Sequence, residues 1–527
     1  MNFLSPQKQK QQKHKVMKRI AASLLLVIIA TTVLAQQRSA KRGIGWDERN
    51  VNSYLSDAAI EKMAPGVSWI YTWGQTPKGT TTLLGTGEEG SMDFAPMCWR
   101  GTYDANAIRN YVKNHPGVKY LLGFNEPNFA VQANMTPADA ADKWPGVEAL
   151  TNGLGLKLVA PALNFTGEAV GGKVWQPYEW FDEFIKKYKE KHGKLPHMDC
   201  LALHCYMDWY GAVTWFATEY FYKDLFDNTK EAYGKYPNIV ELLNSYKATH
   251  GHFPRMMLTE FCAWEESCTS VDFQIDQMTQ KLQKLEQSDL VEGYAWFMAN
   301  PESNDGKPWM GCFVDGRHND SELNDLGKIY VNMSTFDTEK YYGPDEQIQA
   351  KDYVDASTDA RQVKVRPNTD RSNNLPLQIE LPSFDSFSEY QIDVPRTGQH
   401  EIRLRIKTSA SVNLRFYVDE KEVVERTLPN TYGRWKTCEF TITLTEGKHS
   451  VILYNAGISP IFINYWMFGS NADGIEDIKT SDNAEISVYS LNGVKLGGGK
   501  SLQDMHLTKG VYIISQPDEE KKKIVIK

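Results

Sequence analysis

Short apolar segments alternate with amphipathic ones along the first two thirds of the chain. Eight apolar segments have the length and composition of buried strands: 43–47, 68–72, 93–99, 119–125, 157–161, 200–206, 256–260 and 293–298. Between some of them, apolar residues recur at helical spacing, in 104–115, 178–191 and 270–287. Eight strand–helix units in roughly 290 residues match the expected size of a (β/α)8 TIM barrel. A doubly wound open sheet is the alternative, but no glycine-rich phosphate loop follows any of these strands.

The pattern changes after Gly343-Pro344. From about residue 347 to residue 470, apolar and polar positions alternate with a period of two, as in Ile402, Leu404 and Ile406, and no helical pattern intervenes. This alternation predicts an all-β jelly-roll sandwich of roughly 120 residues. Strand patterns at 486–491 and 511–515 predict a third, small β domain. We therefore expect domains at 36–345, 346–470 and 471–527.

The N-terminus has the parts of an export signal. Basic residues up to Arg19 precede an apolar run from Ile20 to Ala35, which ends in small residues suited to a signal peptidase. The run is shorter than the roughly 20 residues that span a bilayer, and no later segment is long enough either. We expect a signal peptide at 1–35, cleavage near Ala35, a mature chain without a transmembrane segment, and a location outside a bacterial cell or on its surface.

The charge and the aromatic content narrow the range of partners. The formal net charge is −8, and the first 35 residues hold six basic groups and no acidic one, so the mature part is more acidic still. Such a chain has no electrostatic reason to bind nucleic acid or an anionic membrane. Aromatic residues make up 12% of the chain, with 14 Trp and 26 Tyr. Rings of this kind stack on flat apolar faces, which favours sugars as ligands.

The cysteines do not form a disulfide framework. Seven cysteines are too few and too scattered for one in a chain of 527 residues, and an odd number leaves at least one free thiol. Cys262 and Cys268 either pair across a short loop or are core residues.

Two glutamates stand at the ends of predicted strands. Glu126 follows the fourth apolar run, in Asn-Glu-Pro-Asn, and Glu260 ends the seventh. Strand alternation places each glutamate on the same face of its strand as two apolar residues. These are Leu122 and Phe124 for Glu126, and Met256 and Leu258 for Glu260. In a barrel both acids would emerge at the C-terminal rim, where barrel enzymes build their sites. An acid and a nucleophile flanking one bond are the minimum for sugar hydrolysis, and a gap of roughly 5 Å would make it retaining.

Each glutamate also has a structural alternative. Asn125-Glu126-Pro127 is a plausible helix start, with Asn125 as the cap and the carboxylate favoured by the helix dipole. Glu260 could be one partner of a buried ion pair. The presence of both acids, on the fourth and seventh of eight strands, favours catalysis.

Further candidates surround the two acids. His204 and Tyr206 share one face of the sixth strand, where they would hydrogen-bond the nucleophile or the sugar. A metal site built from His197, Cys200, His204 and Cys205 is disfavoured, because Cys205 points to the opposite strand face from His204. Tryptophans at or just after strand ends are core residues or stacking platforms for sugar rings; they are Trp73, Trp99, Trp209, Trp264 and Trp296.

Four strand motifs together resemble glycoside hydrolase family 128. They are Gly43-Ile44-Gly45-Trp46, Gly123-Phe124-Asn125-Glu126-Pro127-Asn128, Leu203-His204-Cys205-Tyr206 and Leu258-Thr259-Glu260-Phe261. The resemblance covers about residues 41–329 and implies a secreted (β/α)8 enzyme that cleaves β-1,3-glucans with retention. It also implies Glu126 as general acid/base, Glu260 as nucleophile and Asn125 as a contact to the 2-hydroxyl group of the sugar. No cofactor and no metal are implied.

The two C-terminal regions resemble known modules as well. The sandwich is similar to family 6 carbohydrate-binding modules, through segments 348–353 and 462–465, Tyr390 and Trp435. That resemblance implies sugar contacts by Tyr390 and Trp435, with a spacer role as the alternative. The tail, through motifs at 488–493 and 509–514, is similar to type IX secretion sorting domains, which implies the secretion machinery as a partner.

These observations predict a secreted, retaining glycoside hydrolase, an endo-β-1,3-glucanase acting on glucans of the laminarin or curdlan type. The alternatives are a retaining β-glycosidase acting on another polysaccharide, and a non-catalytic glycan-binding surface protein.

Overall fold

The computed structural model describes residues 38–88, 90–165, 167–207, 219–264, 270–300, 308–314 and 320–469, and four short segments nearer the C-terminus, 486–490, 495–499, 510–515 and 522–526. The predicted signal peptide, Trp209 and Cys268 lie outside the described residues.

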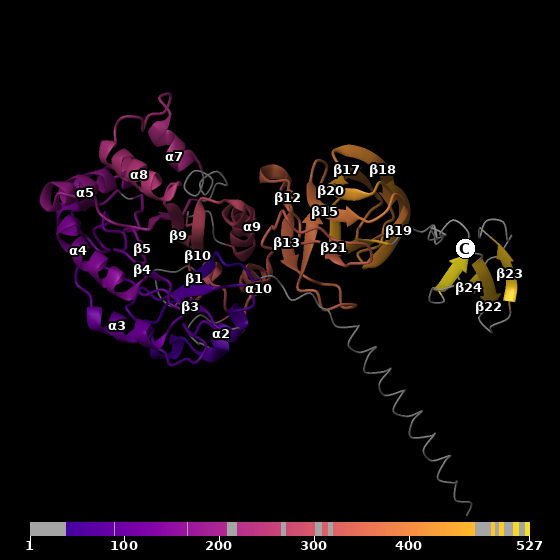
Figure 1. Ribbon diagram of the computed structural model, residues 1–527, viewed down its shortest axis with the longest axis horizontal. Coiled ribbons are helices and arrows are strands. Elements are labelled where there is room, and N and C mark those ends of the chain that lie inside the picture. Colours follow the sequence, from indigo (N-terminus) through magenta and orange to yellow (C-terminus); the bar gives the residue numbers. More distant parts are fainter. Residues whose placement is uncertain are drawn as a thin grey trace, which may run out of the picture.

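Eight parallel strands form the sheet of the first region (Figure 1). They are β1 (Arg42–Gly45), β2 (Trp69–Tyr71), β3 (Asp93–Phe94), β4 (Tyr120–Leu122), β5 (Lys157–Val159), β8 (Cys200–Cys205), β9 (Arg255–Phe261) and β10 (Val291–Trp296). Their order is β3-β2-β1-β10-β9-β8-β5-β4, which is the chain order read around a ring. The ring closes between β3 and β4, where the Cys98 amide donates to Leu122 O at 2.9 Å and Met97 pairs with Leu122. All eight predicted strands are present, arranged as in a (β/α)8 barrel.

Helices follow most of these strands and cover the outside of the ring (Figure 1). They are α2 (Asp57–Met63), α3 (Ala105–Asn114), α4 (Pro137–Leu154), α5 (Pro177–His192), α7 (Glu219–Phe226), α8 (Pro237–His250), α9 (Val271–Gln287) and α10 (Asp325–Asn332). Their starts follow from capping: Asp104 caps α3, Thr136 and Asp139 form a capping box on α4, and Ser270 caps α9. The three helices predicted from periodicity are confirmed. Shorter elements are η1 (Val51–Ser53), η2 (Pro308–Met310) and the hairpin β6 (Ala169–Val170) and β7 (Lys173–Val174).

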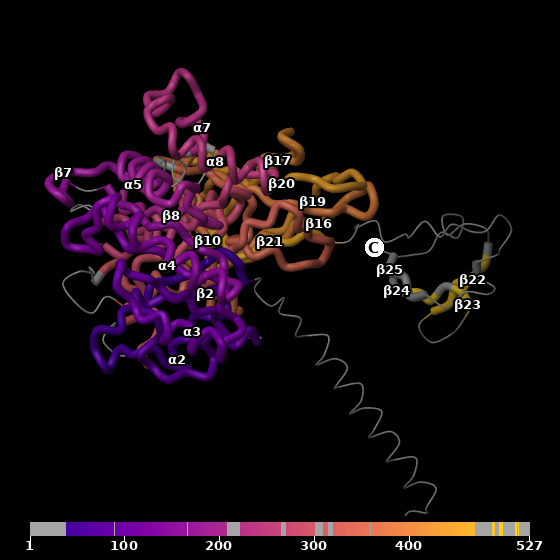
Figure 2. The backbone as a smooth tube through the Cα atoms, turned by 60° about the vertical axis from the view of Figure 1, so that its left-hand side comes forward, coloured from indigo at the N-terminus to yellow at the C-terminus, as the bar shows by residue number. Residues whose placement is uncertain are grey.

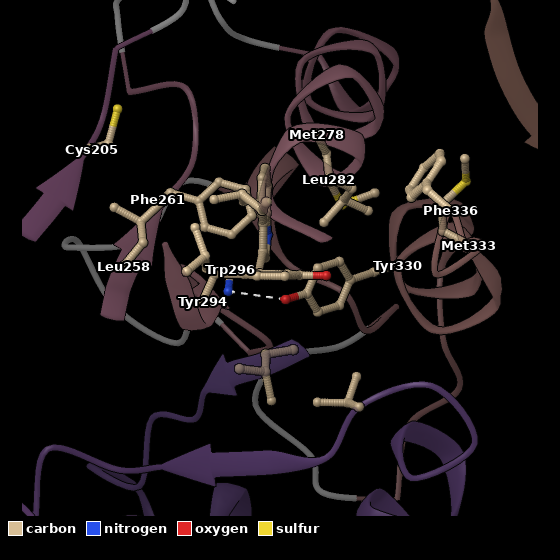
Figure 3. Packing of buried hydrophobic residues seen from close by; sticks show 14 of the residues in the cluster. Cys205, Leu258, Phe261, Met278, Leu282, Tyr294, Trp296, Tyr330, Met333 and Phe336 are labelled. Carbon is tan, nitrogen blue, oxygen red and sulfur yellow. Dashed lines mark hydrogen bonds between the residues drawn. The ribbon is translucent and has the colours of Figure 1, made fainter. Parts of the chain in front are cut away.

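Two apolar layers hold the barrel. The inner layer is contributed by the strands and the residues that follow them; its members are Trp69, Tyr71, Ala95, Met97, Leu122, Val159, Ala162, Cys200, Ala202, Met257 and Ala295. Gly43 on β1 makes room for it, since a Cβ there would lie 2.1 Å from Cε2 of Trp69. The outer layer lies between the strands and the helices (Figure 3), where Trp296 packs with Tyr330 beside Met278 and Leu282. The fold therefore fills the barrel interior and leaves the C-terminal ends of the strands for a site.

Two antiparallel sheets follow the barrel. The first has the order β13-β14-β21-β16-β19, with β11 paired to β21, and the second β12-β15-β20-β17-β18. The strands are β11 (Ile348–Gln349), β12 (Asp355–Ala356), β13 (Lys364–Pro367), β14 (Leu377–Leu381), β15 (Phe387–Val394), β16 (Gly398–Lys407), β17 (Val412–Val418), β18 (Lys421–Leu428), β19 (Lys436–Leu444), β20 (Gly447–Asn455) and β21 (Ile461–Phe468), with η3 (Asp359–Arg361) before β13. Ile402, Leu404 and Ile406 are buried between the sheets, as the alternation predicts. The β-sandwich is confirmed, whereas its jelly-roll connectivity and the domain boundaries stay predictions.

The sandwich meets the barrel along α9 and α10, and it lies against one side of the barrel in both views (Figure 1 and Figure 2). Arg366 Nη1 on β13 lies 2.7 Å from Oδ1 of Asp276 on α9, and Gln362 Nε2 donates to Asp276 O at 2.6 Å. Gln283 Nε2 reaches Oδ1 of Asp355 at 2.7 Å. Polar side chains therefore tie the two regions together.

Four further strands form an antiparallel sheet of their own, in the order β23-β22-β24-β25. They are β22 (Ile486–Ser490), β23 (Lys495–Gly499), β24 (Gly510–Ser515) and β25 (Lys522–Ile526). The strands predicted in the tail are therefore present. In the described part of the chain, every helix is too short or too polar to cross a membrane.

Candidate active site

Glu126 is brought to the rim of the barrel by an irregular backbone after β4. The chain stays extended past Leu122, with Asn125 bridged to Ala162, and the Glu126 amide donates to Ala162 O at 2.8 Å. Glu126 itself has φ of 45°, a left-handed conformation that is uncommon for a residue with a side chain and is often found at functional sites. A turn follows, and the next helix begins only at Pro137. The alternative of a helix start capped by Asn125 is therefore wrong.

Glu260 enters the site through a β-bulge in β9. Leu203 of β8 pairs with Leu258, but His204 pairs with Glu260, so Thr259 is an extra residue on β9. As a result Met257 lies in the inner layer, while Met256 and Leu258 pack in the outer one. The predicted common face for Met256, Leu258 and Glu260 is wrong, because the bulge shifts the alternation by one residue. The alternation predicted after β4 fails likewise: Leu122 lies in the inner layer and Phe124 in the outer one.

His204 connects the two glutamates. Its Nδ1 lies 2.6 Å from Oε1 of Glu126 and 3.4 Å from Oε2 of Glu260. Its Nε2 lies 3.1 Å from Oγ1 of Thr259. The side chains of Glu126, His204 and Glu260 are all buried, with His204 only 1% exposed. One ligand-type atom from each of Glu126, His204 and Glu260 lies within 4.8 Å of the others, so the carboxylates approach one another closely.

Both oxygens of Glu260 accept hydrogen bonds. Nε1 of Trp73 donates to Oε1 at 2.8 Å, and the hydroxyl of Tyr206 donates to Oε2. Donors on both oxygens fix the orientation of the carboxyl group and favour its charged form. The predicted contact between Tyr206 and the acid on the seventh strand is present.

Within the described chain, both hydrogen bonds of the Glu126 carboxylate end on one oxygen. Nδ2 of Asn164 donates to Oε1 at 2.9 Å, and Oε1 is also the atom that faces His204. The second oxygen, Oε2, is therefore the one suited to carry a proton toward a ligand.

Burial and charge set the ionisation of the site. Burial raises the pKa of Glu260, and the negative charge of Glu126 adds to this effect, against the opposing influence of His204, Tyr206 and Trp73. For His204, burial acts to lower the pKa, but the charges of Glu260 and Glu126 outweigh it and raise the pKa above its ordinary value. Because these groups are coupled, the protons belong to the cluster rather than to single residues.

A cavity of about 690 Å³ opens over the two glutamates. Its lining includes the polar side chains of Asn125, Glu126, Asn164, Tyr206 and Glu260, together with those of Asp47, Glu48, Arg49, Thr72, Thr76, Lys78 and Gln132. Aromatic and apolar side chains line its walls: Trp73, Trp99, Phe129, Val131, Phe165, Trp264, Phe297 and Met298. Its volume and its mixture of apolar walls and a few convergent polar groups are those of a small-molecule or oligomer site.

Three of the predicted tryptophans line this cavity and one does not. Trp73, Trp99 and Trp264 are partly exposed and lie on its walls. Trp296 is fully buried in the outer layer, where it packs with Phe261 and Tyr330 (Figure 3). Its Nε1 donates to Met310 O at 2.8 Å. The prediction that Trp296 binds substrate is therefore wrong, since this face of β10 points to the helices.

Two residues that hydrogen-bond Glu126 or His204 were not predicted from the sequence, nor were the cavity-wall residues other than the tryptophans. Asn164 follows β5, and its position just after the predicted strand 157–161 was the available signal. Thr259 precedes Glu260, but nothing in the pattern indicated the bulge that turns it toward His204. Asn125, which was predicted, lines the cavity with a buried Oδ1 that lacks a hydrogen-bond partner within the described chain.

Glu126, His204 and Glu260 also form the group in the described residues whose spacing could hold a metal ion. Their surroundings favour hydrogen bonding instead. Trp73, Tyr206 and Asn164 direct N–H and O–H donors at the carboxylate oxygens, which are the atoms that a cation would need. The metal site considered around Cys200 and Cys205 is not supported, since Cys200 lies in the inner apolar layer and Cys205 in the outer one.

The two sugar contacts predicted in the sandwich differ in outcome. Tyr390 is fully buried between the sheets, where it packs on Trp466 and donates to Ala350 O at 2.7 Å. Its predicted role is wrong, because no sugar can reach the ring. Trp435 is partly exposed, and Nζ of Lys407 lies 5.1 Å from the centre of its ring. A sugar contact by Trp435 stays a prediction.

The chain was compared with protein families, with characterised proteins and with solved structures, and each comparison found a similarity. The model of the family described as glycosyl hydrolase catalytic core matches residues 43–228 and 229–330. Alkali-sensitive linkage protein 1 of Schizosaccharomyces pombe is 25% identical over 301 residues, which cover 56% of this chain and 45% of that protein. The chain thus spans less than half the length of this relative.

Two solved structures are similar to part of the chain. One is a subgroup II endo-β-1,3-glucanase of glycoside hydrolase family 128 from Pseudomonas viridiflava, at 29% identity and a TM-score of 0.40, covering 56% of this chain and 98% of that one. The other is an enzyme of the same description from Sorangium cellulosum, at 27% identity and a TM-score of 0.39, covering 55% and 97%.

The residues matched by the family model run from β1 into α10 and include both glutamates, His204 and the tryptophans of the cavity. The predicted resemblance of this region to a glycoside hydrolase is confirmed, whereas those of the sandwich and the tail stay predictions. The chain belongs to the glycosyl hydrolase catalytic core family, and it is a glycoside hydrolase.

Proposed function

We propose that the chain hydrolyses its substrate with retention of configuration. The carrying observation is the close approach of the two carboxylates, which offer oxygens within 4.8 Å of one another. Retaining enzymes hold their two carboxyl groups roughly 5–5.5 Å apart, whereas inverting enzymes separate them by roughly 6.5–9.5 Å to admit a water molecule. The short spacing supports direct attack by one glutamate on the anomeric carbon.

The hydrogen bonds support Glu260 as the nucleophile and Glu126 as the acid/base. Trp73 and Tyr206 hold Glu260 as an oriented carboxylate, while Oε2 of Glu126 can carry a proton. Glu126 protonates the glycosidic oxygen, whose bond to the anomeric carbon breaks as Glu260 attacks that carbon and forms a glycosyl ester. Having given up its proton, Glu126 then takes one from a water molecule that attacks the anomeric carbon, which breaks the ester bond and returns Glu260 to its carboxylate form.

The cavity walls support a sugar chain as the substrate. Trp73, Trp99 and Trp264 present rings on which the apolar faces of sugars stack. The unpartnered Oδ1 of Asn125 beside Glu126 is an acceptor suited to a sugar hydroxyl group. We assign that contact to the 2-hydroxyl group of the sugar bound to Glu260.

The substrate is proposed to be a β-1,3-glucan, with endo cleavage. This step is supported by the four strand motifs shared with glycoside hydrolase family 128, and the acids of two of those motifs lie in the site.

We further propose that the chain is exported by residues 1–35, that Trp435 contributes a secondary sugar contact, and that the tail engages a type IX secretion machinery. The runner-up is a retaining β-glycosidase acting on another polysaccharide.

The test is the release of reducing ends by residues 36–470 from laminarin, curdlan, mixed-linkage glucan, xylan and mannan. Glu126→Gln and Glu260→Gln variants are the controls, and Glu61→Gln on the exposed side of α2 is the matched surface variant. Turnover confined to β-1,3-linked substrates and abolished in both site variants supports the proposal. Turnover on xylan or mannan alone keeps the mechanism and discards the substrate. Binding without turnover on any of the five favours a glycan-binding protein.

A further inference from the structure

We propose that Thr259 is a positioning residue of the active site, whose hydroxyl group holds His204 with Nδ1 facing both carboxylates in each protonation state of the ring. This inference rests on the proposed function, because the roles of the two glutamates are assigned there. It is independent of the substrate.

The bulge in β9 gives Thr259 its place. The residue is extra with respect to β8, where His204 pairs with Glu260, and the register with β10 also shifts, from Leu258 against Tyr294 to Phe261 against Trp296. Without the extra residue, the period of two would turn Glu260 away from the cavity. The bulge therefore places Glu260 and the hydroxyl of Thr259 in the same site.

A hydrogen bond from the inner side of the barrel fixes the backbone of the bulge. The hydroxyl of Tyr71 on β2 donates to Thr259 O at 2.9 Å, and Thr259 is only 2% exposed. Burial raises the pKa of Tyr71 well above its ordinary value, and Glu260 adds to the effect, so this hydroxyl stays a donor at every pH of interest. The side chain of Thr259 is thus fixed against Nε2 of His204 at 3.1 Å.

A hydroxyl group suits this position because it can donate or accept. When the ring is neutral with its proton on Nδ1, the threonine donates to Nε2; when the ring is protonated on both nitrogens, the threonine accepts from Nε2–H. In both states Nδ1–H points at Glu126 and Glu260. A buried ring without this partner would leave Nε2–H unsatisfied when charged, which costs free energy.

The titratable groups around His204 come from three directions. Glu126 faces it from the segment after β4, Glu260 from β9, and Tyr206 from its own strand, with the two rings 6.3 Å apart. Tyr71 on β2 touches Thr259 rather than the ring. A loss of charge on His204 therefore acts first on the two glutamates, and it removes an influence that holds down the pKa of Glu260.

The experiment compares Thr259→Val, which keeps the shape and removes the hydroxyl, with Thr259→Ser, which restores it. Thr151→Val is the matched control, because Thr151 is equally buried in α4 and its hydroxyl donates to Val147 O, away from the site. The measurements are kcat and KM against pH on a β-1,3-glucan oligosaccharide, and the ¹⁵N NMR titration of the His204 ring, assigned with a His204→Gln variant.

Thr259→Val is expected to lower kcat about tenfold with KM nearly unchanged, and to move the acid limb of the profile about one unit toward higher pH. The acid limb moves toward higher pH because Glu260 ionises less readily once His204 loses its charge. Thr259→Ser is expected to stay within about threefold of the parent, and Thr151→Val to leave the profile in place.

An unchanged profile in Thr259→Val, an equal loss in Thr259→Ser, or an equal shift in Thr151→Val would overturn the proposal. If the parent cleaves no β-1,3-glucan, the proposed function fails and the NMR titration alone decides. A lower titration midpoint of His204 in Thr259→Val supports the positioning role, and an identical midpoint contradicts it.

Discussion

The indole nitrogen of Trp73 donates a 2.8 Å hydrogen bond to Oε1 of Glu260, although Trp73 follows β2 and Glu260 lies on β9. Trp73 adopts φ of 58°, and its ring packs edge-on against Tyr71 and Phe297. A tryptophan that was predicted only as a wall of the sugar site thus also orients Glu260, the proposed nucleophile.

Replacing this donor separates the two roles of Trp73. Trp73→Phe keeps a ring and removes the N–H, so the carboxylate loses a charge-assisted hydrogen bond of the kind that contributes about 1.5–3 kcal/mol. We expect kcat to fall roughly 10- to 100-fold, with a smaller change in KM. Trp99→Phe, at another tryptophan that lines the cavity, should mainly raise KM. Equal effects of the two substitutions on kcat would show that Trp73 acts only as a wall.

His204 should make stability depend on pH. Its pKa is raised in the folded state, so its contribution is fully present below the ordinary histidine pKa of about 6.5 and is lost as the pH rises through the raised value. Between pH 5 and 9, we expect the Tm difference between the parent and His204→Gln to be largest at the acidic end and to shrink toward alkaline pH. Calorimetric or fluorescence melts measure it. A difference that grows with pH would contradict the charge balance assigned to the site.

Asn164 offers a test of the acid/base. Asn164→Asp would replace the amide donor on Oε1 of Glu126 with a second carboxylate, and a nearby negative charge disfavours the charged form of an acid. We expect the alkaline limb of the pH–rate profile, which reports loss of the proton from the acid, to move toward higher pH. Asn164→Ala, without the charge, serves as the control and should lower kcat with little movement of the limb. A limb that moves toward lower pH in Asn164→Asp would argue against Glu126 as the proton donor.

A buried arginine at the other end of the barrel gives a prediction for stability. Arg42 is fully buried, pairs with Glu286 at 2.9 Å and donates to the carbonyls of Tyr330, Met333 and Ser334. Arg42→Met leaves these partners unsatisfied and should destabilise the fold by about 3–5 kcal/mol. The exposed pair Lys189–Glu241 is the contrast, since Lys189→Met should cost no more than about 0.5 kcal/mol. Chemical denaturation of both variants measures the difference.

The barrel could be predicted from the sequence because its signal is repeated. Eight apolar runs with helical segments between them specify both the elements and their order, and each expected strand is present. The strand ends were also located well enough to select Glu126, His204 and Glu260. Since parallel strands end at one rim, finding the strand ends amounts to finding the site.

The directions of the side chains could not be predicted in the same way. Strands of a barrel are buried on both faces, so a period of two does not say which face is inside. This is why Trp296 was placed in the site although it packs against the helices. Tyr390 was expected to contact sugar from the family resemblance alone, whereas the alternation along β15 puts it on the buried face with Ile392 and Val394. The left-handed backbone of Glu126 and the bulge at Thr259 break the period altogether, and they depend on contacts with neighbouring strands.

The central claim is that Glu126 and Glu260 act as the acid/base and the nucleophile of a retaining hydrolysis. The most direct measurement is ¹H NMR of the first product anomer released from a β-1,3-linked oligosaccharide by the parent enzyme, before mutarotation. We predict that the β-anomer appears first and that neither Glu126→Gln nor Glu260→Gln produces it at a comparable rate. Initial release of the α-anomer would contradict the account, because it would require a water molecule between two carboxylates that lie too close together to admit one.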